Sequence, residues 1–199
     1  MFKRKTMFAA LALALGFAGA AKADSMPGML GHDHTGITVP DMDQAVKFFT
    51  EVIGCKKAMS FGPFQDDKGN FMKDVLDVNP RAVITQITMI RCGVGSNIEL
   101  FSYKSPDQQV VQPKNSDVGG YHIAFYVEDI KAADAYLRSK GVWTLFGPVP
   151  IEQGPAAGQA IVYFKAPWGL QMEAISYPKG MAYEKDASTI LWSPKDPSK

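Results

Sequence analysis

Two stretches of the chain decide the fold: His34-Thr-Gly-Ile-Thr-Val-Pro-Asp41 and His122-Ile-Ala-Phe-Tyr-Val-Glu-Asp129. Laid on one another, they match at the His, at a Val five residues later and at an Asp seven residues later. Downstream of each lies a second matching pair, Ile98-Glu-Leu-Phe-Ser-Tyr103 and Met172-Glu-Ala-Ile-Ser-Tyr177. Self-similarity of this kind indicates an internal repeat, so the sequence predicts two related modules.

Each opening stretch leads into a helix. Asp41 precedes apolar residues at helical spacing and has Gln44 three residues later, which is a capping-box pattern, and Gly54 closes this helix. Asp129 and Gly141 bound the second helix in the same way.

Further β-rich runs follow each helix, at 55–62 and 82–92 in the first copy and at 143–149 and 159–165 in the second. Each copy is therefore β-α-β-β-β. The predicted fold class is α+β, with βαβββ modules over 32–104 and 120–178 that form a cupped mixed sheet around a metal site.

The metal site follows from strand periodicity. Side chains alternate between the two faces of a strand, so each repeated His lies opposite the apolar residues that meet the helix. The same alternation brings Glu99 and Glu173 to the face that carries His34 and His122. Ionised carboxylates among apolar neighbours are costly unless they are paired or bind a metal. These four residues predict one divalent ion per chain, Zn, Ni, Co, Mn or Fe.

The N-terminus has the pattern of a secretory signal peptide. Lys3, Arg4 and Lys5 precede an apolar run that ends in Ala21-Lys-Ala23, and this run is shorter than the roughly 18 to 20 residues that a membrane span needs. Removal of residues 1–23 leaves 17 Lys and Arg against 20 Asp and Glu, a net charge of −3. We expect a periplasmic or secreted protein without membrane attachment, and the absence of a basic patch argues against nucleic acid as a partner.

The chain has only two cysteines, Cys55 and Cys92. One begins the second expected strand and the other ends the third, which are neighbouring positions in an antiparallel pair. Because export permits a disulfide, we predict that Cys55 and Cys92 form one, and two separate buried thiols are the alternative.

Two segments lie outside the repeat. The surplus of the first copy falls in 63–80, which we expect to be a partial lid over the site. The tail, 179–199, mixes aromatic and polar residues, and we expect it to pack on the body or on a neighbouring subunit. The second arrangement would make the protein a homodimer.

Residues 32–178, with their repeated His and Glu, resemble the vicinal oxygen chelate superfamily, which includes glyoxalase I, extradiol dioxygenases, methylmalonyl-CoA epimerase and bleomycin-binding proteins. The resemblance implies metal ligands from the first and last strands of each module. It also implies a metal-dependent lyase or isomerase that moves a proton on a small oxygenated, metal-chelating substrate, with Glu173 as the catalytic base and Glu99 as the more constant ligand.

The sequence departs from bacterial glyoxalase I at two positions. Thr38 and Tyr103 stand where that enzyme has an Arg and an Asn that hold glutathione, which argues against glutathione as co-substrate. The cavity lining is expected to be small or aromatic, as suits a small oxygenated or aromatic compound. The candidate substrate-binding residues are Thr38, Phe101, Tyr103, Tyr126, Trp168 and Tyr177.

Two alternatives stay open. One is an extradiol-type dioxygenase, but its additional acid-base His has only His32 as a candidate, and a fourth ligand, Glu99, fills a position that such an iron site keeps free. The other is a non-catalytic module that binds a small molecule such as an antibiotic, and such binders commonly lack the metal ligands.

Overall fold

The computed structural model describes residues 26–198. The chain divides into two compact units, Met1–Gly31 and His32–Lys199. Of the first unit the structure describes a turn in which the Met29 amide donates to the Met26 carbonyl. The expected signal peptide, 1–23, lies outside the described residues. None of the helices that the structure describes is long and apolar enough to cross a membrane.

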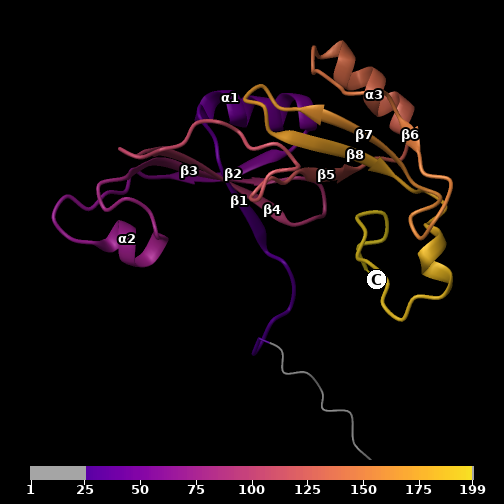
Figure 1. The fold of residues 1–199 in the computed structure, drawn as a ribbon, viewed down its shortest axis with the longest axis horizontal. Helices are drawn as coiled ribbons and strands as arrows, with labels where there is room; N and C mark the ends of the chain where they lie inside the picture. The colour runs from indigo at the N-terminus through magenta and orange to yellow at the C-terminus, as the bar shows by residue number, and fades with distance from the viewer. Residues whose placement is uncertain (1–25, 199) are drawn as a thin grey trace, which may run out of the picture. The chain divides into compact units, whose positions relative to one another are not determined.

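Two four-stranded sheets form this unit, one for each repeat (Figure 1). The first has the strand order β1-β4-β3-β2, in which β1 is parallel to β4 and the other neighbours are antiparallel. Its elements are β1 (His34–Thr38), α1 (Met42–Lys47), a π-helical continuation (Phe48–Ile53), β2 (Lys56–Phe61), α2 (Phe71–Leu76), β3 (Val83–Arg91) and β4 (Asn97–Lys104).

The second sheet repeats this topology with the order β5-β8-β7-β6. Its elements are β5 (Ile123–Tyr126), α3 (Ile130–Ser139), β6 (Val149–Pro150), β7 (Ala160–Lys165) and β8 (Gln171–Ser176), and a 3-10 helix follows (Ala182–Lys185). The predicted pair of βαβββ modules is therefore confirmed. The expected strand 143–149 is wrong in extent, because only a bridge from Thr144 to Phe164 and the short β6 pair with β7 there.

The helix boundaries follow from local hydrogen bonds. The Asp41 carboxylate accepts from the Gln44 amide at 2.9 Å, and the Asp129 carboxylate accepts from the first amides of α3. Gly54 ends the π-helical turn with φ at +87°, a left-handed conformation that glycine adopts without steric cost. Asp41, Asp129 and Gly54 are therefore confirmed as capping residues, whereas α3 has Lys140 as its C-cap, one residue before the expected Gly141.

One hydrophobic core serves both modules. Ile98 and Leu100 of β4 and Met172 and Ala174 of β8 are buried in the same cluster as residues of α1 and α3. The indole of Trp168, which precedes β8, lies edge-on to the ring of Phe48 with 5.8 Å between centroids, so the second module packs directly on the helix of the first. We call the opposite face of each sheet the site face.

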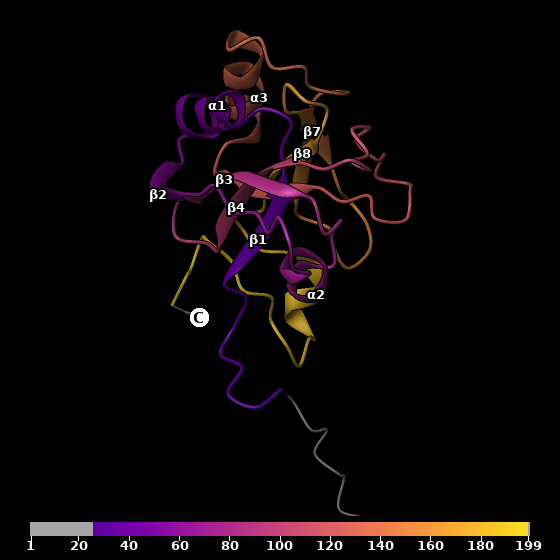
Figure 2. The same ribbon diagram turned by 90° about the vertical axis from the view of Figure 1, so that its left-hand side faces the viewer.

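Segments from outside the repeat lie on the site-face side. In Figures 1 and 2, α1 and α3 lie on one side of the strands, and α2 and the C-terminal segment lie on the other. Met72 of α2 is fully buried in a small cluster against which Phe101 and Tyr103 pack. The segment 63–80 thus covers part of the first site face, as expected of a partial lid.

Cys55 and Cys92 form a disulfide, with 4.3 Å between their Cα atoms, and the predicted pairing is confirmed. It links the residue before β2 to the residue after β3, across a sequence separation of 37 residues.

We expect the double substitution Cys55→Ala and Cys92→Ala to lower the free energy of unfolding by about 3 to 4 kcal/mol, because the bond restricts the unfolded chain. Denaturant titration without reductant measures this loss. Reduction should destabilise the parent by a similar amount and leave the double variant unchanged. A variant as stable as the oxidised parent would contradict the expectation.

Candidate functional site

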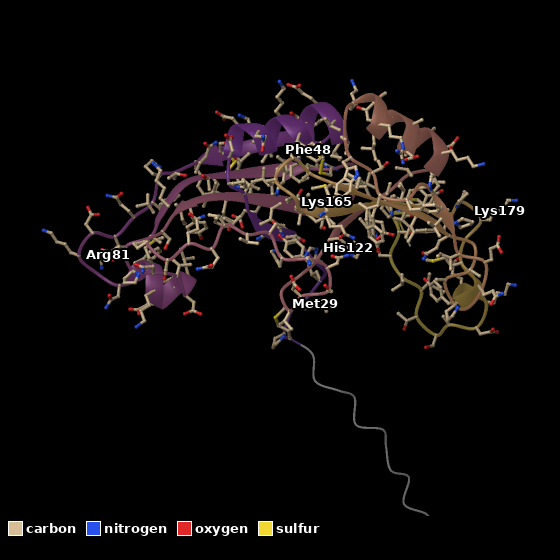
Figure 3. All side chains as sticks on the ribbon, turned by 45° about the horizontal axis from the view of Figure 1, so that its top comes forward. Met29, Phe48, Arg81, His122, Lys165 and Lys179 are labelled. Carbon is tan, nitrogen blue, oxygen red and sulfur yellow. A yellow bond between two sulfur atoms is a disulfide. The ribbon has the colours of Figure 1, made fainter. Side chains whose placement is uncertain are left out.

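Each module places one His beside one Glu on its site face. His34 Nε2 lies 3.2 Å from a carboxylate oxygen of Glu99, and His122 Nε2 lies 2.9 Å from a carboxylate oxygen of Glu173. The parallel pairing of the first and last strands produces both contacts, because Gly36 is the register partner of Glu99 and Ala124 that of Glu173. In Figure 3, Phe48 lies in the helix layer and His122 lies on the other side of the sheets.

The four expected ligands therefore form two pairs. Among residues 26–198, no group of three or more His, Cys, Asp or Glu side chains is close enough to hold a metal ion. We name the pairs half-site 1 (His34 and Glu99) and half-site 2 (His122 and Glu173). Each offers one imidazole nitrogen and one carboxylate, a donor combination that suits the divalent metals expected from sequence.

Each histidine is oriented by a neighbour that the sequence did not single out. Asp33 accepts a 2.7 Å hydrogen bond from His34 Nδ1, and this bond is the main cause of a raised pKa of His34. Asn115 lies 3.3 Å from His122 Nδ1. In both cases a bond to Nδ1 leaves Nε2 directed at the Glu, as in metal sites where a second residue fixes the imidazole.

The two carboxylates differ in burial. The Glu173 side chain is 8% exposed and that of Glu99 is 19% exposed. Burial raises the pKa of the Glu173 carboxyl, and His122 and the Tyr163 phenol partly oppose that shift. A raised carboxyl pKa is characteristic of general bases that work near neutral pH.

Tyr163 lies next to half-site 2, and the sequence analysis did not identify it. Its phenol lies near the Glu173 carboxyl and lowers the pKa of that group, and its ring lies edge-on to the His122 ring with 5.3 Å between centroids. Burial is the main reason that the pKa of Tyr163 is raised, so the phenol keeps its proton. The available signal was the antiparallel register, which places Tyr163 opposite Glu173, whereas Met89 stands opposite Glu99 in the first module.

The six expected substrate-binding residues separate into distinct environments. Tyr126 and Tyr177 line a cavity of about 720 Å³ on the second site face. Thr38, Tyr103 and Trp168 line a smaller cavity of about 150 Å³. Phe101 stacks on Tyr103 beneath α2, and the Trp168 indole also contacts the core through Phe48 and Phe49.

Comparison with known proteins agrees with this architecture. Residues 33–163 match the family model described as the Glyoxalase/Bleomycin resistance protein/Dioxygenase superfamily, and the chain belongs to that superfamily. A 2-epi-5-epi-valiolone epimerase from Actinomyces sp. is 45% identical over 171 residues, which cover 85% of this chain and 92% of the epimerase. This relative supports an enzyme of the isomerase type.

Solved structures share the fold. A glyoxalase family protein from Bacillus cereus aligns with a TM-score of 0.60 at 20% identity, over 77% of this chain and 98% of that protein. A glyoxylase/bleomycin resistance protein/dioxygenase domain from Frankia sp. aligns with a TM-score of 0.53 at 17% identity, over 75% of this chain and 98% of that domain.

The burial of Glu173 predicts a pH effect on the metal-free protein. Its folded pKa lies above the ordinary value of 4.5, so the folded state binds more protons than the unfolded state, and stability falls as pH rises from that value towards the folded pKa. Glu173→Gln should remove this loss and flatten the pH dependence of the unfolding free energy, measured by denaturant titration with a chelator present. Glu99→Gln is the matched control, because its side chain is more exposed. Equal pH slopes for the parent and Glu173→Gln would refute the assignment.

Proposed function

We propose that this protein is an exported, metal-dependent epimerase that moves a proton on a small hydroxylated ketone at half-site 2. The observation that carries the proposal is the buried Glu173, which lies against the His122 imidazole and near the Tyr163 phenol. Its register partner, Ala124, lines a cavity of about 720 Å³. The epimerase relative, at 45% identity, supports this reaction class and makes 2-epi-5-epi-valiolone the first compound to test.

Epimerisation requires that a carbon lose its proton and regain one on the opposite face. A C–H bond next to a carbonyl is the acidic one, and Glu173 takes that proton as the general base. The Tyr163 phenol favours the ionised form of this carboxyl and so supports its role as the base. A proton from solvent then adds to the opposite face of that carbon, which completes the inversion, and Glu173 releases the proton that it took to water.

A divalent metal fits the donor set but needs both half-sites. His34, Glu99, His122 and Glu173 would hold it, and the metal would supply a Lewis acid that polarises the substrate oxygen. Because the described residues of a single chain form separate pairs, we propose a symmetric homodimer in which half-site 1 of one protomer meets half-site 2 of its partner.

Export is part of the proposal. The signal pattern in residues 1–23 supports it, as does the Cys55–Cys92 disulfide, because such bonds persist mainly in oxidising compartments. Glutathione is not proposed as co-substrate, since Thr38 and Tyr103 replace the residues that hold it in bacterial glyoxalase I.

The shared site can be tested by subunit mixing. His34→Ala and His122→Ala should each lose most bound metal, as measured by elemental analysis. Unfolding and refolding an equal mixture should restore about a quarter of the parent's metal sites, because half of the dimers are hybrids and each hybrid has one intact site. Each variant refolded alone is the control. No recovery in a mixture shown to contain hybrids would exclude the shared site.

The chemistry is tested by isotope exchange. Incubation of 2-epi-5-epi-valiolone with the metal-loaded enzyme in D2O should introduce deuterium at one carbon. NMR measures the rate of this exchange. Glu173→Gln should slow the exchange by about 100-fold or more, because the amide cannot accept the proton. Glu152→Gln, an exposed position, is the control. Substrate-dependent oxygen uptake would favour the dioxygenase alternative, and binding without exchange would favour the non-catalytic module.

A further inference from the structure

The two site faces are covered by different segments and to different degrees. On the first, α2 packs against Phe101 and Tyr103, which follow Glu99 on β4. The repeat makes Ile175 and Tyr177 their equivalents after Glu173, and these residues line the cavity of about 720 Å³. The open space for a ligand therefore lies on the second site face.

This cavity is lined by strand neighbours of half-site 2 and not by His122 or Glu173 themselves. These neighbours are Ala124, the register partner of Glu173, and Ile175, two residues after Glu173 on β8. A loop that includes Gln159 forms one wall, and the chain end forms the remainder. We call residues 178–196 the C-terminal strap.

The strap is anchored at both ends. Near its start, the amides of Ala182 and Tyr183 donate to the carbonyls of Ala157 and Pro155, both at 2.9 Å. The loop passes so close that a Cβ placed on Gly158, which has φ at +105°, would lie 2.6 Å from the carbonyl oxygen of Gly180. Any side chain at Gly158 would force the two segments apart.

The far end of the strap is tied to the last residue of the repeat. The hydroxyls of Tyr177 and Ser193 are 2.8 Å apart, and Lys195 Nζ donates to the Tyr177 carbonyl at 3.3 Å. Trp192, the residue before Ser193, lines the cavity. Its indole also approaches the turn between β3 and β4, where a Cβ on Gly95 would lie 3.5 Å from it. The strap thus places an aromatic ring over the cavity.

The lining determines the ligand class. The Tyr126 ring and the Trp192 indole offer aromatic surfaces to the C–H face of a ring, and the Tyr177 ring, whose centroid lies 4.9 Å from that of Tyr126, lies beneath the Lys195 ammonium. Gln159 offers a neutral hydrogen-bonding group, and the Ser193 hydroxyl is shared with that of Tyr177. The charged lining residues are bonded within the chain, Lys195 to the Tyr177 carbonyl, Glu184 to the Met181 amide and Asp196 to the Ser198 hydroxyl. A volume of about 720 Å³ is within the usual range of small-molecule sites.

We propose that the cavity under the C-terminal strap is the substrate pocket, and that it takes a neutral hydroxylated ring with its reacting carbon beside half-site 2. This inference rests on the proposed function for the reaction, but the pocket and its ligand class stand on the strap itself. Trp192 acts in it as a residue that determines specificity.

The test compares two similarly exposed tryptophans, Trp192 in the strap and Trp143 on the helix side of the second module. Calorimetric titration of the metal-loaded protein with 2-epi-5-epi-valiolone should show that Trp192→Ala binds about tenfold more weakly than the parent, the cost of one lost aromatic contact. Trp143→Ala should bind as the parent does. Cyclohexanone and dihydroxyacetone, which lack either the hydroxyls or the ring, should bind the parent more weakly.

Equal affinity of Trp192→Ala and the parent, or a preference for either comparison compound, would overturn the inference. A second variant that ends at Lys185 should lose binding and keep the denaturant midpoint of the sheet core, and unchanged binding by it would overturn the inference too. The two proposals fail separately. Strap-dependent binding without deuterium exchange would contradict only the proposed reaction, whereas exchange that Trp192→Ala leaves unchanged would contradict only the pocket.

Discussion

The burial of one face of each sheet beneath a shared helical layer constrains the rest of the unit that starts at His32. Side chains alternate along a strand, so the commitment of Leu100 and Ala174 to that core leaves Glu99 and Glu173 on the opposite face. A shift of one residue in either strand would bury a different set and remove a carboxylate from the site face. The contact of Trp168 with Phe48 then packs one repeat against the other.

The local features of this architecture could be predicted from sequence. Capping by Asp41, strand alternation and the position of Cys55 relative to Cys92 depend on spacing and periodicity, which are local or repeat along the chain. The partition of the four ligands into two pairs could not be predicted, because it depends on how whole modules pack. Asn115 gave no signal, since it lies in the connection between the repeats and has no counterpart in the first copy.

The burial of Glu173 in half-site 2 lowers the stability of the folded state and also suits this carboxylate to act as a general base. A carboxylate as buried as Glu173 destabilises the folded state unless other groups compensate, and here His122 and Tyr163 provide only part of that compensation. Function commonly retains such residues at the expense of stability. The corresponding Glu99 is more exposed and faces Met89 across the strand pair, so the two halves of the repeat have diverged in their electrostatics.

The strap follows β8, the last strand of the described residues, whereas α2 lies between paired strands, and this difference affects how the fold can change. A longer or shorter α2 segment must still return the chain to the start of β3 in register. The strap is not constrained in this way, since no strand follows it within the described residues. Mutation, recombination or deliberate grafting can therefore exchange the strap while the duplicated sheets stay intact. A library of straps on one unaltered scaffold is the natural route to variants that accept new ligands.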